Sequence, residues 1–142
     1  MQVEASKQRS GVLDAFVQKV YSVLSATPLR WLSLVSTLPA DVLRLPLAAG
    51  EWSAADCLQH LLDTEQYVFP VRVGNFLTGK DLANFDPDAV ARDGAARPPA
   101  CLAADFAVLR MESLGLLLDI KAQDLARTVN HSALGQSRWR RC

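Results

Sequence analysis

The sequence predicts an all-α protein that folds as a helical bundle. Apolar residues recur three and four positions apart in several stretches, which is the spacing that lines one face of an α-helix. A clear helix start, formed by Ser53 with Asp56 three residues later, precedes one of these stretches. The sequence shows neither sustained strand-like alternation nor long internal repeats, which argues against β architectures and solenoids.

The first helical region is predicted over residues 12–38. Apolar side chains spaced four apart run over residues 12–24, and a second stripe follows over residues 31–38. Pro28 lies between the two stripes and suits the first position of a new helix, with Thr27 as its cap. The region is therefore predicted to form either two helices or one bent helix.

The second helix is predicted over residues 53–78. The capping box begins it, and Trp52 just before the cap can pack on Cys57 as a hydrophobic staple. Pro70 lies inside this helix, where it removes a backbone donor and clashes with the preceding turn. We therefore expect a kink near residues 66–69.

The remainder of the chain predicts a loop, a third helix and a short tail. Turn-forming residues crowd positions 79–99, and a bundle seam then runs over residues 102–120. The few residues after Gly135 leave no room for the fourth helix that normally closes such a bundle. We predict an incomplete helical bundle domain over residues 1–135 and a disordered basic tail over residues 136–142.

Composition excludes several classes of partner. The 142 residues fit one domain, and 15 Lys plus Arg balance 15 Asp plus Glu, so no net field attracts nucleic acid or an anionic membrane. No apolar run approaches the roughly 18 residues that a membrane helix needs. We expect a cytoplasmic protein with no nucleic-acid or membrane partner.

The three cysteines predict reduced thiols. Cys57, Cys101 and Cys142 are scattered and lack C-x-x-C spacing, which argues against a disulfide framework and a thiolate zinc site. Cys57 is interpreted as a small core residue rather than a nucleophile.

Five further residues could serve a functional site, but a structural role is favoured for each. Glu65 and Arg72 could orient a substrate, but ion pairs with neighbouring helices are favoured. Asp63 could be an added metal ligand or outer-shell partner, but a solvated carboxylate is favoured. Trp31 and Trp52 could line a cavity, and packing is favoured for both.

Several short motifs occur in a fixed order along the chain. They are Thr27–Trp31, Gly50–Ser53, His60–Glu65, Phe69–Arg72, Asn84–Asp88, Phe106–Arg110 and Asp124–Arg127, followed by His131 and Gly135. Taken in this order, they resemble the DinB-like family. The resemblance covers nearly all of the chain beyond the first twenty or so residues.

The resemblance implies a four-helix bundle, commonly dimeric, with a divalent metal site. Complete relatives bind zinc or nickel through one histidine of the second helix and two histidines of a His-x-x-x-His motif on the last helix. His60 matches the first of these and is the candidate metal ligand. His131 precedes Gly135 and so lies before the expected last helix, where it is poorly placed to complete the site.

The end of the chain offers a hypothesis for the missing helix. The residues Ser137 to Cys142 can be encoded by TCN CGN TGG CGN CGN TGY, and shifting the frame back by one base gives a mostly apolar helical start. We hypothesise that a single-base deletion near the codon of Ser137 truncated an ordinary family member. An AGY codon for Ser137, or an AGR codon for Arg138, Arg140 or Arg141, would remove this argument.

The resemblance implies a relation to metal-dependent hydrolases or thiol-dependent transferases of small molecules. We expect this chain to be inactive, because a catalytic metal generally needs about three protein ligands and His60 is one. No catalytic residue is assigned, and the substrate is not identified.

The alternative is a noncatalytic module that self-associates or dimerises through an apolar groove. A composite site between two chains, with His60 and Asp63 contributed twice, is a third hypothesis.

Overall fold

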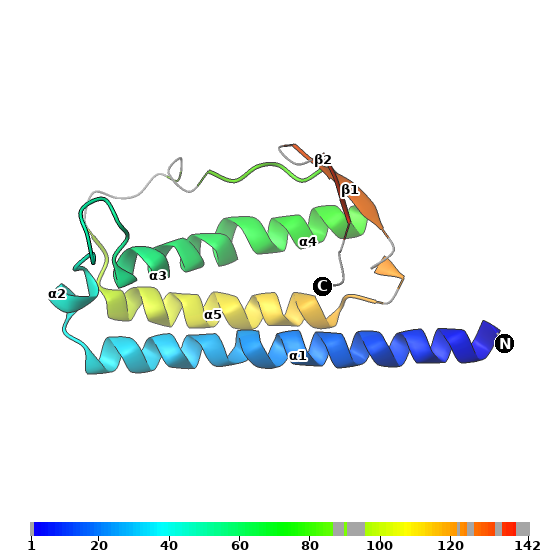
Figure 1. Ribbon diagram of the computed structural model, residues 1–142, viewed down its shortest axis with the longest axis horizontal. Helices are drawn as coiled ribbons and strands as arrows, with labels where there is room; N and C mark the ends of the chain where they lie inside the picture. Colours follow the sequence, from blue (N-terminus) through cyan, green and yellow to red (C-terminus); the bar gives the residue numbers. More distant parts are fainter. Residues whose placement is uncertain are drawn as a thin grey trace.

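The computed structural model describes residues 2–86, 90, 96–121, 123–124, 127–132 and 135–138. Within these ranges three long helical units lie side by side (Figure 1). They are α1 (Gln2–Thr37), a composite unit of α3 (Ala54–Asp63), η1 (Thr64–Val68) and α4 (Phe69–Thr78), and α5 (Pro99–Leu118). α5 lies between the other two and packs against both. The predicted helical bundle is confirmed, and the described ranges hold no fourth long helix.

The direction of the helices follows from the connections between them. α1 runs antiparallel to the composite unit and to α5, which run parallel to each other (Figure 1). The short helix α2 (Ala40–Leu43) turns the chain between α1 and α3 and buries Leu43. Arg44 after it donates to the Arg97 carbonyl at 2.9 Å, which ties this turn to the start of α5. No helix in the described part of the chain has the length and apolarity to cross a bilayer.

α1 is a single helix, although the sequence left two helices as an alternative. It begins at Gln2, well before residue 12, and continues through Pro28. The Thr27 hydroxyl donates to the Val23 carbonyl at 3.1 Å, so Thr27 acts within the helix rather than as a cap. Pro28 is buried, and tertiary packing of α1 against α5 outweighs the backbone bond that the proline removes.

The composite unit begins where the sequence predicts, and its hydrogen bonding is irregular next to the predicted kink. The Ser53 hydroxyl accepts the Asp56 N–H at 3.2 Å and the Asp56 carboxylate accepts the Ser53 N–H at 2.9 Å, a complete capping box. The disturbance expected before Pro70 takes the form of the π-helical turn η1, in which the Phe69 N–H bonds to the Thr64 carbonyl. Such turns insert one extra residue into a helix and often occur at functional sites.

The core lies where α3, α5 and α1 meet. Its buried members come from two helices: Leu58 and Leu62 of α3, and Leu102, Ala103 and Phe106 of α5. Trp31 and Val35 of α1 pack against this cluster, so the prediction that Trp31 is a packing residue is confirmed. This cluster fixes the relative position of the three units from which the site below is built.

A β-hairpin follows α5 and corrects the expectation of a chain without strands. β1 (Thr128–His131) pairs antiparallel with β2 (Gly135–Arg138), and Leu82 from the long connection pairs with His131 in parallel. The strands are too short to stand out in the sequence, although burial alternates along β1. β2 begins at the predicted domain boundary and extends into the segment expected to be a disordered tail. Residues 139–142 lie outside the described residues.

Candidate functional site

The candidate metal ligand His60 lies on the flank of α3 beneath an aromatic ring. Its imidazole is 5.1 Å from the Trp52 ring, centroid to centroid, at an interplanar angle of 59°. The Nδ1 atom of His60 is buried and has no hydrogen-bond partner among the described residues. An orphaned buried imidazole nitrogen is the kind of atom that a metal ion could use.

Two predictions about the neighbours of His60 are wrong. Cys57 is exposed rather than part of the core, because it lies away from the stripe of α3 that buries Leu58 and Leu62. Trp52, for which a packing role was predicted, lies against the His60 ring. Asp63 is not a solvated carboxylate: it is 2% exposed and accepts a hydrogen bond from Gln59 Nε2 at 2.8 Å.

The described side chains around His60 do not form a zinc or nickel site of the kind that the family resemblance implies. No cluster of three or more His, Cys, Asp or Glu side chains suited to a metal ion occurs within the described ranges. A catalytic zinc typically takes three protein ligands and a water. Among the described residues, His60 therefore offers one suitable nitrogen and has no companion ligands that would hold an ion with it.

The second histidine lies in a different part of the fold. His131 on β1 is 8% exposed, and its Nε2 atom is 3.4 Å from an Nη2 atom of Arg72 on α4. Arg72 follows His60 by twelve residues, which corresponds to about 18 Å along a helix axis. The structure thus joins His131 to Arg72 near the hairpin and does not bring the two histidines together.

A buried ion pair lies one turn beyond His60. Glu65 Oε1 and Arg110 Nη2 are 2.7 Å apart, with the side chains 4% and 9% exposed. The structural ion pair predicted for Glu65 is present, but its partner was not identified from the sequence. Arg110 also stacks over the Phe106 ring, 5.1 Å from its centroid. The sequence contains one signal that could have identified this partner. Arg110 follows Phe106 by four residues and so places a charge on the buried stripe of α5.

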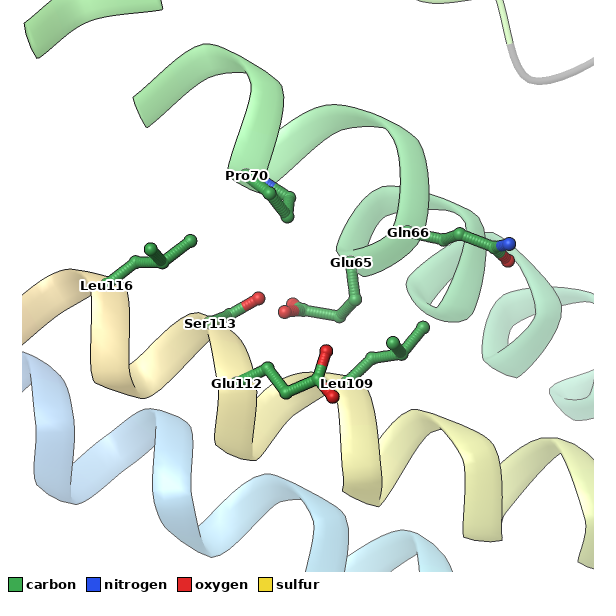
Figure 2. A pocket seen from close by; sticks show the side chains of 7 residues that line it. All are labelled: Glu65, Gln66, Pro70, Leu109, Glu112, Ser113 and Leu116. Atoms are coloured by element: carbon green, nitrogen blue, oxygen red, sulfur yellow. The ribbon is translucent and has the colours of Figure 1, made fainter. Parts of the chain in front are cut away.

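The Glu65 carboxylate borders a pocket between the composite unit and α5. The pocket has a volume of about 310 Å³ and is lined by Glu65, Gln66, Pro70, Leu109, Glu112, Ser113 and Leu116. Figure 2 shows the carboxylate of Glu65 and the hydroxyl of Ser113 pointing toward one another across it. Glu65 Oε2 and Ser113 Oγ are buried and have no hydrogen-bond partner among the described residues.

Comparison with known proteins shows which solved structure this architecture is similar to and which family the sequence matches. A solved structure of YfiT from Bacillus subtilis, described as a probable metal-dependent hydrolase with an unusual four-helix bundle topology, is similar in fold with a TM-score of 0.71. The match covers 86% of this chain and 72% of that chain at 20% sequence identity. No curated protein matches the chain. The sequence model of the DinB superfamily matches residues 24–141, most of the length. The chain therefore belongs to the DinB superfamily.

Proposed function

We propose that His60 is one ligand of a DinB-type metal site and that the described residues supply no other. The observation that carries this proposal is the buried, unpartnered Nδ1 atom of His60, which lies outside any three-residue donor cluster of the described ranges. On this account the chain binds zinc or nickel weakly through His60. It has no hydrolase or thiol-transferase activity by itself, because a single imidazole neither retains a metal nor fixes its geometry.

Metal titration of the wild-type chain and a His60→Ala variant tests this proposal. Zinc and nickel are added while the melting temperature is followed, because a ligand that binds only the folded state raises it. A small increase that disappears in His60→Ala is expected. Tight metal binding that survives the substitution, or metal-dependent hydrolysis by the wild-type chain, would contradict the proposal.

A gain-of-function variant makes the test sharper. A fused C-terminal helix carrying a His-x-x-x-His motif should raise metal affinity strongly, because two imidazoles one turn apart can join His60. The matched control carries Ala-x-x-x-Ala in the same helix and should bind metal as weakly as the wild-type chain. Equal affinities of the two fusions would show that His60 does not lie in a metal site.

Self-association is the second candidate function, and the outer face of α5 favours it. Six exposed residues form this face: Cys101, Ala104, Val108, Met111, Gly115 and Leu118. None is charged, and Val108, Met111 and Leu118 are 60%, 59% and 52% exposed. The outward face of a bundle helix normally carries charged residues. A second copy of the chain would remove this apolar surface from water.

A Met111→Glu substitution tests the α5 face. A charge at its centre should shift the monomer–dimer equilibrium toward monomer by about tenfold or more, measured by sedimentation equilibrium. Leu29→Glu is the matched control, because Leu29 is an equally exposed apolar residue on α1, at 69%. If wild type is monomeric at high concentration, or if only Leu29→Glu disrupts the dimer, the α5 face is not the interface.

A further inference from the structure

The pocket between the composite unit and α5 has the chemistry of a small-molecule site. Its volume of about 310 Å³ falls within the range of ligand pockets, and three apolar residues, Pro70, Leu109 and Leu116, supply much of its wall. The polar groups converge at one place, where Glu65 and Ser113 face one another (Figure 2). An apolar wall with a few convergent polar atoms is the usual composition of such sites.

Two buried polar atoms beside the pocket lack a hydrogen-bond partner among the described residues, and each can accept a hydrogen bond. Glu65 and Ser113 are each only 4% exposed, and Glu65 Oε2 and Ser113 Oγ have no hydrogen-bond partner within the described ranges. Arg110 engages the other carboxylate oxygen, Oε1, at 2.7 Å. The Phe106 ring under the guanidinium helps to fix that contact. Glu65, which borders the pocket, therefore has one carboxylate oxygen bound to Arg110, and its second oxygen is buried without a partner among the described residues.

The local charge favours a cation. Two carboxylates border the pocket, Glu65 inside and the exposed Glu112 at the rim, and one guanidinium offsets them. The net negative balance opposes an anionic ligand. A bare metal ion fits less well, since its ligands would be two carboxylates in a cavity much larger than an ion and walled largely by apolar groups. An organic ammonium group on a short apolar body satisfies both the acceptors and the wall.

The π-helical turn forms one side of this pocket. Gln66 lies within η1, Pro70 follows it, and both contribute to the lining. An extra residue in the turn widens the helix at the point from which the Glu65 side chain projects. The same turn therefore shapes the wall of the pocket and positions the Glu65 carboxylate. We propose that this pocket binds a small organic cation, with the ammonium group donating to Glu65 Oε2 and Ser113 Oγ and the apolar body against Pro70, Leu109 and Leu116.

Benzylammonium and benzyl alcohol form a matched pair of probes for this site. They share an aromatic body, but only the first carries a charge, so an ionic hydrogen bond to Glu65 should favour it by about tenfold or more. Backbone amide shifts in an NMR titration should locate binding at Glu65 and Ser113. Equal affinity of the two probes, no saturable binding of benzylammonium, or shifts confined to other regions would overturn the proposal.

Two variants test the site without disturbing the buried ion pair. Leu116→Trp should block the pocket and abolish benzylammonium binding, whereas Leu29→Trp on exposed α1 should leave it unchanged. Glu112→Gln should weaken binding about twofold to fivefold through loss of an exposed charge, and Glu51→Gln, a distant exposed control, should not. Circular dichroism confirms that each variant is folded. Undiminished binding by folded Leu116→Trp would place the ligand elsewhere and refute the site.

Discussion

At the scale of single residues, the buried pair of Glu65 and Arg110 is the most consequential feature of the molecule. It joins η1 to α5 by one contact of 2.7 Å between side chains that water hardly reaches. A buried pair need not stabilise a fold relative to apolar residues, because both charges lose their hydration. Removing one partner is different, since the other charge then stays buried without compensation.

An Arg110→Met variant should therefore be strongly destabilised. The expected loss is about 3 to 5 kcal/mol in the free energy of unfolding, measured by urea denaturation. The control is Arg97→Met, which breaks the ion pair with Asp105 where both side chains are about half exposed. That change should cost about 1 kcal/mol or less. Equal losses in the two variants would show that the Glu65 pair does not behave as a buried one.

At the scale of the elements, local sequence signals decide where the composite helix begins and where it is irregular. Ser53 and Asp56 close the capping box, and Pro70 follows the π-helical turn η1. Both features depend on neighbours within a few residues, so both were predictable. Asp63 and Cys57 were not assigned correctly, because the sequence gives the spacing of a stripe but not which partner helices cover each flank.

A Ser53→Ala variant measures the contribution of the cap. Ser53 is 4% exposed, and its hydroxyl accepts the Asp56 N–H, which would otherwise lack a helical partner. The expected loss is about 1 kcal/mol in the free energy of unfolding. Ser33→Ala, at an exposed position near the C-terminal end of α1, should be neutral or slightly stabilising because alanine favours helix. A neutral Ser53→Ala would mean that the capping box contributes nothing to stability.

At the scale of the whole molecule, the bundle and its family were predictable, and the pocket was not. Helical spacing and the ordered motifs identify the architecture that the superfamily match confirms. The ion pair of Glu65 with Arg110, and the pocket that Glu65 lines together with Ser113, depend on residues more than forty positions apart. Those contacts exist only once α5 packs beside the composite unit. The hairpin was missed for a related reason, since it pairs four-residue strands whose pattern is too short to read.

The arrangement of the molecule also separates its two proposed binding features. His60 lies on the flank of α3 beneath Trp52, whereas the cation pocket lies between η1, α4 and α5. Evidence for one is therefore not evidence for the other. The proposed metal binding rests on His60, and the number of imidazoles that surround a bound metal is the quantity that tests it.

X-ray absorption spectroscopy of the nickel-loaded, tag-free chain measures that number directly. The account predicts one imidazole in the first coordination shell of the metal, with the remaining positions filled by water oxygens, and loss of the imidazole signal in His60→Ala. Two or three imidazoles around each nickel ion, whether from one chain or from two chains sharing a site, would contradict the claim that this protein supplies a single family ligand.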